Sequence, residues 1–266
     1  MEQRKTGPAP TADEAFSDRP QEDIIAGRNA VAEALRAGRA IDSVLLAKGD
    51  RAGSISALAA QCRRKGLLVK EVDSRKLDAL CGPNHQGIAA LAACKETVTL
   101  DELFAAAEAK GEPPFFVVCD ELEDPHNLGA ILRTAETAGV HGVVIPKRRS
   151  AGLTSAVYKA SAGAVEYVPV ARVSNITDAL REMKKRGVWV YGLDMDGETW
   201  CSVDMKGAAA VVVGSEGRGI SRLVKEQCDF IVSLPMRGHI TSLNASVACG
   251  IVLYEAARQR QGLAAK

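Results

Sequence analysis

Three separated stretches in the C-terminal half of the chain place glycine and small polar residues directly after apolar runs. They read DPHNLGAILRTAETAG from Asp124, VVVGSEGRGIS from Val211 and LPMRGHITSLNASVACG from Leu234. At such positions a strand can present its backbone to a ligand or lead into a helix. We therefore expect the three stretches to converge on one site that the rest of the chain supports.

The first stretch predicts a helix that opens just after a strand, with Asn127 as its N-cap. Gly129 in the first turn permits the close approach of another backbone. Arg133 lies on the face opposite the apolar stripe, where a rigid helix could present it to a phosphate or a sugar hydroxyl. By itself the stretch favours the plainer alternative of a solvated arginine. The buried stripe is expected to contain Leu128, Ile131, Leu132, Ala135 and Ala138.

The second stretch is a glycine loop after an apolar strand. Its spacing, G-x-x-G-x-G from Gly214 to Gly219, differs from the dinucleotide-binding fingerprint, and no acidic ribose partner follows. Glu216 lies inside the loop, where a carboxylate repels phosphate. We therefore expect this loop to face a cation or a hydroxyl group.

The third stretch predicts a strand, a loop and a long C-terminal helix that Thr241 or Ser242 caps. Leu243 and Asn244 would then lie in the first turn, with free amides that point to a ligand. His239 could serve a hydrolase, but no G-x-S-x-G nucleophile elbow accompanies it. A histidine-based triad is therefore not expected.

These motifs resemble those of the SpoU branch of the SPOUT RNA methyltransferases. Asn127 to Ala135 matches N-x-G-(A)-x-x-R-T-A, Gly214 to Gly219 matches G-S-E-G-x-G, and Pro235 to Ser246 matches P-M-x-G-x-x-x-S-L-N-x-S. The match departs from the family at Ala245, where valine is usual. Spacing and order agree across the whole C-terminal half.

The N-terminal part is similar to the small substrate-binding domain of the same branch, with GRNAV from Gly27 and HQGI from His85. The chain looks closest to the bacterial 23S rRNA guanosine-2′-O-methyltransferases, because it contains the sequence YKASAGAVE from Tyr158. The resemblance implies S-adenosylmethionine-dependent methylation of the ribose 2′-hydroxyl of a guanosine in 23S rRNA. It also implies a C-terminal α/β trefoil-knot domain with a parallel sheet, a smaller N-terminal α/β RNA-binding domain, and a homodimer.

The same resemblance assigns the functional residues. The implied catalytic residues are Asn127, Arg133, Glu216, Ser242 and Asn244. The implied cofactor-binding residues are Gly192, Gly214, Leu234, Met236, Leu243 and Ser246. A guanidinium rarely gives up its proton, so Arg133 is expected to bind a phosphate and stabilise the nascent alkoxide rather than act as the base. Because the cationic sulfur and the developing oxyanion neutralise each other, a dry apolar pocket without a metal suits the reaction.

Composition limits the remaining possibilities. A chain of 266 residues with 47% hydrophobic and 25% charged residues is expected to be globular and to form two domains. The net charge of +1 argues against indiscriminate binding to DNA. Seven cysteines without a CxxC pair indicate neither zinc nor a disulfide framework. We find no secretory signal or membrane segment and expect a cytoplasmic location.

Four segments are predicted along the chain. Residues 1–21 are a disordered tail, 22–95 an α/β RNA substrate-binding domain, 96–114 a linker and 115–266 the methyltransferase domain. The linker contains one amphipathic helix and ends at two prolines, which cannot continue it. Apolar runs that alternate with helical patterns indicate a mainly parallel sheet, covered on both faces. These runs are FFVVC, GVVIP, YVPVA, VWVYGL, AAAVVVG and FIVSLP.

RNA contacts are expected to come from basic clusters at 63–65, 147–149 and 184–186, each of which is also typical of an ordinary solvated surface. The cluster at 147–149 is the best candidate because it follows a strand of the methyltransferase domain. Aromatic residues form only 4% of the chain, so shape and backbone contacts should dominate over base stacking. Two alternatives remain, a tRNA or other rRNA ribose as substrate, and a non-catalytic RNA-binding or ribosome-assembly factor.

Overall fold

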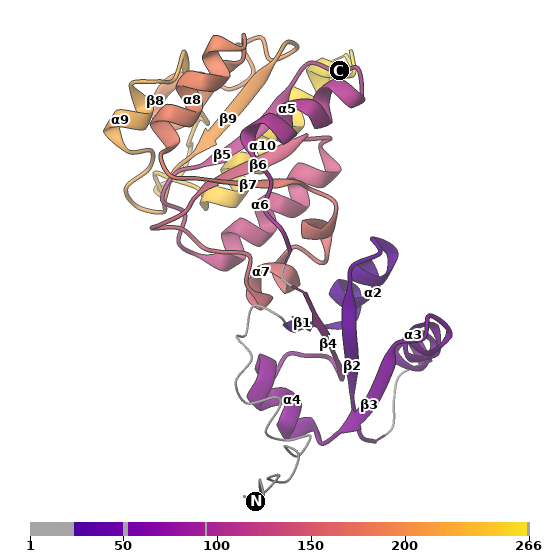
Figure 1. Cartoon of the computed structure of the whole chain (residues 1–266). Coiled ribbons are helices and arrows are strands. Elements are labelled where there is room, and N and C mark those ends of the chain that lie inside the picture. The colour runs from indigo at the N-terminus through magenta and orange to yellow at the C-terminus, as the bar shows by residue number, and fades with distance from the viewer. Residues whose placement is uncertain (1–23, 50–52, 94, 265–266) are drawn as a thin grey trace, which may run out of the picture.

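The computed structural model describes residues 24–49, 53–93 and 95–264. These residues form two α/β units, one around a four-stranded sheet and one around a six-stranded sheet, as Figure 1 shows. The tail expected at residues 1–21 lies outside the described residues.

The smaller unit has the strand order β1-β4-β2-β3. Its strands are β1 (Ile24–Ala26), β2 (Ile41–Ala47), β3 (Leu68–Val72) and β4 (Ile88–Ala92), and its helices are α2 (Arg28–Arg36), α3 (Gly53–Arg64) and α4 (Ser74–Cys81). Alternate residues of β2 face opposite sides of the sheet. Val44 and Leu46 belong to the core that contains residues of α2 and α3, whereas Leu45 packs with Leu77 of α4. Helices therefore cover both faces of this sheet.

The larger unit has the strand order β10-β8-β9-β5-β6-β7, and every pair of neighbours is parallel. Its strands are β5 (Phe115–Cys119), β6 (Gly142–Pro146), β7 (Val170–Val173), β8 (Trp189–Thr199), β9 (Ala209–Val213) and β10 (Phe230–Ser233). The parallel sheet predicted from the apolar runs is confirmed. The trefoil knot stays a prediction of the family resemblance.

Helices cover both faces of the larger sheet. They are α5 (Leu100–Ala109), α6 (Pro125–Thr137), α7 (Ser155–Ala160), the short η2 (Ala164–Glu166), α8 (Ile176–Lys185), α9 (Arg222–Lys225) and α10 (Ala245–Arg260). Phe115 and Val117 of β5 share a core with α6 and α10, whereas Phe116 and Val118 share one with α5, α8 and α9. The continuous apolar strands predicted from the sequence reflect this burial on both faces.

The segment expected to link the domains, residues 96–114, packs against the larger unit. A capping box formed by Thr99 and Glu102 starts α5. Leu103 is fully buried, and a Cβ added at Gly142 of β6 would lie 2.4 Å from its Cδ2 atom. Val98 forms an isolated parallel β-bridge with Ala171 of β7. The amphipathic helix predicted in this segment therefore contributes to the core of the larger unit.

Helix α6 begins earlier than the sequence indicates. Asp124, not Asn127, is the N-cap, because its Oδ1 accepts a hydrogen bond from the His126 amide at 2.9 Å and Pro125 occupies the first helical position. Asn127 lies in the first turn, so its side chain is available for contacts outside the helix. Gly129 allows α6 to lie against α7, since a Cβ there would lie 2.9 Å from the Ser161 amide.

Buried polar contacts connect the two units. The Arg39 guanidinium donates to Glu166 Oε2 at 3.0 Å and to the Tyr158 hydroxyl at 2.9 Å, and both charged side chains are largely buried. A hydrophobic core with residues from both units continues through this region. Breaking one partner of a buried ion pair is costly, so this contact fixes how the smaller unit sits on the larger.

Lys95 lies in the same interface and donates to the carbonyl groups of Val165 and Val168. Burial lowers the pKa of Lys95 to about 8, although Glu166 opposes that shift and Arg39 adds to it. In the unfolded chain the amine has an ordinary pKa of about 10.4. Burial of the charged amine costs free energy of folding. This cost is fully present at pH values below the pKa of Lys95 in the folded protein, and it disappears above its pKa in the unfolded chain.

We expect the free energy of unfolding of the wild type, relative to a Lys95→Met variant, to rise as the pH increases from about 8 to 10.4. In that window the unfolded wild-type chain binds more protons than the folded one. The measurement is urea denaturation of both proteins at a series of pH values. The difference between the two curves isolates Lys95 from the cysteines and tyrosines that titrate nearby. Parallel curves would contradict this assignment.

Candidate active site

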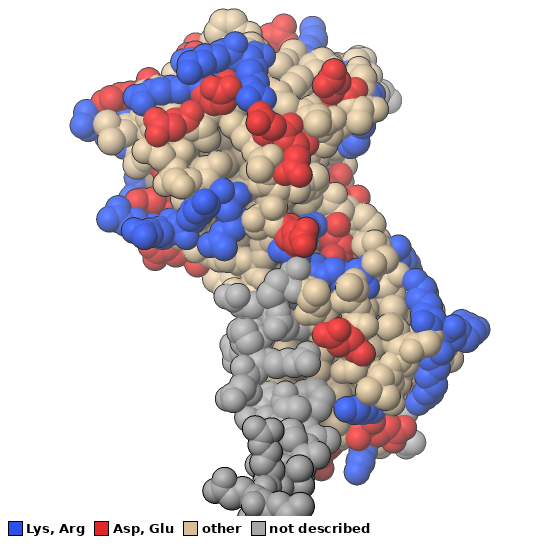
Figure 2. Space-filling model, in the orientation of Figure 1, with Lys and Arg blue, Asp and Glu red and all other residues tan. Residues whose placement is uncertain are grey.

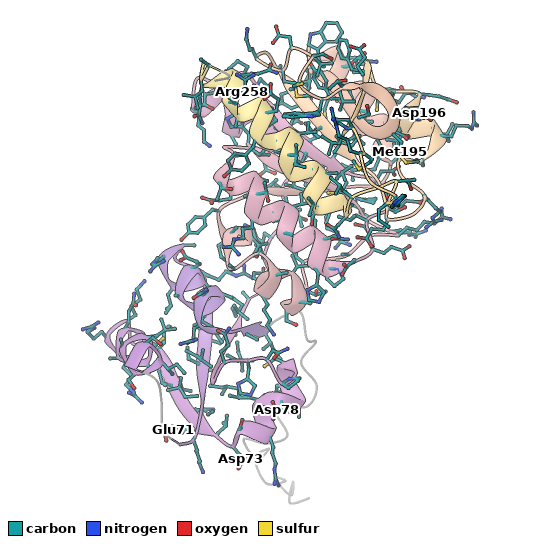
Figure 3. All side chains as sticks on the ribbon, turned by 180° about the vertical axis from the view of Figure 1, so that it is seen from behind. Glu71, Asp73, Asp78, Met195, Asp196 and Arg258 are labelled. Carbon is teal, nitrogen blue, oxygen red and sulfur yellow. The ribbon has the colours of Figure 1, made fainter. Side chains whose placement is uncertain are left out.

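A cavity of about 870 Å³ opens in the larger unit, next to the carboxyl ends of β8, β9 and β10. In parallel α/β sheets ligands bind at this edge, because the loops that follow the strands converge there. The cavity wall comes from the middle of β8, from the loops after β9 and β10, and from the start of α10. Its lining includes Leu193, Asp194, Met195, Gly214, Glu216, Arg218, Leu234, Met236, Ser242, Leu243 and Asn244. Figure 3 shows the labelled Met195 on the larger unit, beside the loops that surround α10.

The three stretches singled out in the sequence meet at the Glu216 carboxylate. Glu216 Oε1 accepts hydrogen bonds from Asn127 Nδ2 at 2.9 Å and from Asn244 Nδ2 at 2.6 Å. The Asn244 Nδ2 group also donates to Asn127 Oδ1 at 2.8 Å. One carboxylate therefore joins α6, the glycine loop and the start of α10. The predicted convergence of these stretches is present in the structure.

The start of α10 differs from the sequence prediction. Asn244 is the N-cap, not Thr241 or Ser242, and the helix begins at Ala245. The Asn244 Oδ1 atom accepts hydrogen bonds from the Ser246 and Val247 amides at 2.9 and 3.3 Å. The oxygen of Asn244 thus caps the helix while its nitrogen binds Glu216. Tertiary contacts select this residue among several that can cap a helix.

The glycine loop after β9 is tightly closed. Ser215 and Gly219 exchange two backbone hydrogen bonds, at 2.9 and 3.1 Å. A Cβ on Gly214 would lie 2.0 Å from the carbonyl carbon of Gly219, so only glycine fits there. The buried Asp120 carboxylate holds the far end of the loop by accepting a hydrogen bond from the Ser221 amide at 2.7 Å. Sequence analysis missed Asp120, although an acidic residue directly after β5 was a usable signal.

The residues expected to contact a cofactor divide into two groups. Gly214, Leu234, Met236 and Leu243 line the cavity. Gly192 and Ser246 do not. Gly192 packs beneath the wall, where an added Cβ would lie 2.8 Å from Cys228 Sγ, and the Ser246 hydroxyl donates to Asn244 Oδ1 at 2.6 Å. Both therefore support residues that form the cavity.

Arg133 is exposed on α6 and does not line the cavity. Within the described part of the chain its guanidinium has no hydrogen-bond or ion-pair partner. Its neighbour Thr134 lies close to Gly250 of α10, where an added Cβ would be 3.5 Å from Thr134 Cγ2. Helices α6 and α10 lie side by side, as Figure 3 shows, and Arg133 is an exposed residue of this helix pair.

The two carboxylates of the cavity wall have different partners, a cation for Asp194 and neutral amides for Glu216. Asp194 Oδ2 pairs with Lys225 Nζ at 2.7 Å, and this hydrogen bond raises the pKa of Lys225. Glu216 is surrounded by neutral amide donors.

Among the described residues no group of three or more His, Cys, Asp or Glu side chains could hold a metal ion. No helix in the same residues is long and apolar enough to cross a membrane.

The fold is that of an α/β protein with a cavity of the size of a small-molecule site at the carboxyl edge of a parallel sheet. A family model described as the SpoU rRNA Methylase family matches residues 114–254. A second, described as RNA 2′-O ribose methyltransferase substrate binding, matches residues 24–98. The chain therefore belongs to the SpoU rRNA methylase family and is an RNA methyltransferase with a substrate-binding domain. The resemblance in the sequence and the expected enzyme class are confirmed.

Similar proteins cover nearly the whole chain. A Bacillus subtilis protein named "Putative TrmH family tRNA/rRNA methyltransferase YacO" is 48% identical over 241 residues, which are 90% of this chain and 97% of that protein. The AdoMet-bound rRNA methyltransferase of Sinorhizobium meliloti superposes with a TM-score of 0.72 at 25% identity, over 95% of this chain and 90% of that one. The SpoU methyltransferase AviRb of Streptomyces viridochromogenes has a TM-score of 0.75 at 22% identity, over 94% and 97%, and shares the fold.

We expect Asn244→Ala to reduce the free energy of unfolding by about 1 kcal/mol, because α10 loses its N-cap. Asn244→Ser keeps an oxygen that can cap the helix but loses the amide that binds Glu216. The serine variant should therefore recover most of the stability. Urea denaturation of the three proteins measures this difference. Equal stability of the alanine and serine variants would show that capping is not the main structural role of Asn244.

Proposed function

We propose that this protein transfers the methyl group of S-adenosylmethionine to the ribose 2′-hydroxyl of a guanosine in 23S rRNA. The observation that carries the proposal is the convergence of Asn127, Glu216 and Asn244 beside the cavity. Family membership supports the RNA methyl transfer, and the Sinorhizobium relative is described as an AdoMet-bound rRNA methyltransferase. The guanosine in 23S rRNA rests on the sequence likeness around Tyr158.

The residues of the cavity fit S-adenosylmethionine. A volume of about 870 Å³ lies in the range of small-molecule sites. Leu234, Met236 and Leu243 supply apolar wall, and the closed loop at Gly214 leaves backbone groups within reach of a ligand. When bound, the cofactor supplies an electrophilic methyl group on a cationic sulfur. An apolar wall favours a reaction in which opposite charges disappear.

We assign the orientation of the attacking hydroxyl to Glu216, Asn244 and Ser242. The Glu216 carboxylate is held in place by two amide donors, and it keeps a second oxygen that can accept a hydrogen bond. Ser242 also lines the cavity and can donate or accept. Asn127 positions the carboxylate from the first turn of α6. Rigid donors and acceptors of this kind lower the barrier without a metal.

Arg133 acts, in this proposal, on the cavity of a second copy of the chain. It is exposed on α6, which packs against α10, and α10 and the segment before it expose five large apolar side chains among polar ones. Exposed large apolar side chains of this kind are typical of an interface between subunits. A two-fold homodimer formed by α6 and α10 would cover them and present Arg133 to the partner. The exposed apolar residues are Met236, Ile240, Leu243, Val247 and Tyr254.

The substrate is tested by incubating the protein with labelled S-adenosylmethionine and separate pools of tRNA, 16S and 23S transcripts. We expect label in the 23S pool, at a guanosine ribose that resists alkaline cleavage. An Arg133→Ala variant should lose roughly 10² to 10³ in rate with little change in cofactor affinity, since Arg133 does not line the cavity. Label confined to tRNA would support the alternative substrate that the names of the relatives also allow. Label on a base would refute the reaction type.

The proposed dimer is tested by mixing two inactive variants, Arg133→Ala and Glu216→Ala. In a mixed dimer the first chain supplies an intact cavity and the second supplies the arginine. We expect co-expression with two different tags to restore activity in about a quarter of the sites, because half of the dimers are mixed and each has one complete site. Purified mixed dimers without activity would show that Arg133 does not act across the interface. An Arg133→Lys variant serves as a control, because it keeps the positive charge and loses the two parallel donors of the guanidinium group.

A further inference from the structure

Two arginines face one carboxylate at the carboxyl edge of the sheet, outside the site described above. Glu121 follows β5, Arg149 follows β6 and Arg218 follows β9. Strand β5 lies between β6 and β9 in the sheet. The carboxylate therefore comes from the middle strand and the two guanidinium groups from the strands on either side. Arg218 also lines the cavity, so the group lies at its mouth.

Each oxygen of the Glu121 carboxylate faces a different arginine. Oε1 is 3.4 Å from Arg149 Nη1, and Oε2 is 3.9 Å from Arg218 Nη2. The arginine side chains are 79% and 72% exposed, whereas that of Glu121 is 27% exposed. Exposed ion pairs at such distances are weak. Another anion with two accessible oxygens can replace the carboxylate.

The loops that carry this group are held in place. Glu121 and Arg149 have φ values of 50° and 56°, a left-handed conformation that is uncommon for residues other than glycine. The Ala151 amide donates to the Leu122 carbonyl at 2.8 Å, which joins the two loops directly. Backbone contacts of this kind keep Glu121 opposite Arg149. The two charges are therefore positioned by the fold rather than by chance contact of long side chains.

The surroundings are basic. Lys147 and Arg148 are exposed in the same loop as Arg149, and Arg172 donates to the Lys147 carbonyl at 3.3 Å. The acidic neighbours are Glu123, which is exposed, and Asp124, which caps α6. Figure 2 shows Lys and Arg side chains gathered on the left of the larger unit, next to a smaller acidic area. The positive charge favours an anionic partner.

We propose that Arg149 and Arg218 form a clamp for one backbone phosphate of the RNA substrate, and that Glu121 occupies the clamp until the phosphate displaces it. The inference rests on the proposed function, because it takes RNA as the ligand and the cavity as the site of reaction. A phosphodiester carries one negative charge and two unbridged oxygens, as a carboxylate does, so it can take the place of the carboxylate between the two guanidinium groups. The displaced Glu121 carboxylate stays on its loop and exchanges its arginine partners for water. Guanidinium groups bind such oxygens well.

Through this exchange Glu121 helps the protein to discriminate RNA from small anions. A weak anion or an isolated phosphate must compete with a carboxylate that is always present, whereas RNA held at other points of the surface does so at high local concentration. Removal of the carboxylate should therefore strengthen RNA binding. Removal of Arg149 should weaken it and release fewer counterions.

The test measures the dissociation constant of the full-length protein for the RNA pool that it methylates, at several KCl concentrations. We expect Arg149→Gln to weaken binding about tenfold and to reduce the slope of log affinity against log salt by about one. Glu121→Gln should tighten binding, and most of that gain should vanish in the Glu121→Gln, Arg149→Gln double variant. In methyl transfer, Arg149→Gln should raise the KM for RNA and leave kcat at saturating RNA nearly unchanged.

The control is Arg181→Gln, which removes an exposed arginine from an exposed ion pair with Asp178 on α8. The clamp is refuted if Arg149→Gln changes affinity and salt slope no more than this control does. It is also refuted if Glu121→Gln weakens binding, since the carboxylate would then support RNA binding rather than compete with it. A wild-type protein that neither binds nor methylates any RNA pool would overturn the proposed function and the clamp together. Normal methylation by Arg149→Gln at low RNA concentration overturns the clamp alone.

Discussion

The Glu216 carboxylate, held by the amides of Asn127 and Asn244, is the interaction on which the site depends. Hydrogen bonds to a charged acceptor are stronger than those between neutral groups. To form them, α6 must start early enough to leave Asn127 in its first turn, and the glycine loop must close tightly at Gly214. The cap of α10 must also be the same asparagine that binds the carboxylate. Local structure in three distant segments is therefore adjusted to one anionic group.

The rest of the fold keeps this group at a fixed place relative to the smaller unit. Parallel pairing brings the loops after β5, β6, β9 and β10 to one edge of the sheet. The contact of Arg39 with Glu166, and the core that continues through both units, prevent the smaller unit from moving freely. The substrate-binding domain and the cavity are therefore held in one defined relative orientation.

The strands and the motifs could be predicted because each is encoded locally. Runs such as FFVVC at 115–119 and AAVVV at 209–213 are continuous, apolar and bounded by turn residues. The three residues of β1 are too few for a pattern, so that strand was not predicted. The predicted N-cap residues of α6 and α10 were wrong. Asp124 and Asn127 can both cap α6, and Ser242 and Asn244 can both cap α10, so the local sequence does not distinguish them. In the structure Asn127 and Asn244 both donate to Glu216, and only Asn244 is also an N-cap. These long-range contacts are not visible in the local sequence.

The arrangement of charge explains how a chain with a net charge of +1 can be suited to RNA. Away from the cavity, several basic side chains are paired with acidic ones on the same surface, as Arg181 is with Asp178 and Arg186 with Asp101. At the carboxyl edge the single carboxylate of Glu121 faces two arginines, with more basic residues beside it. The net charge averages over both regions and hides the difference. Because attraction between exposed charges falls off within about 8 to 10 Å in salt, a phosphate at the cavity mouth interacts with this local imbalance and not with the average charge of the chain.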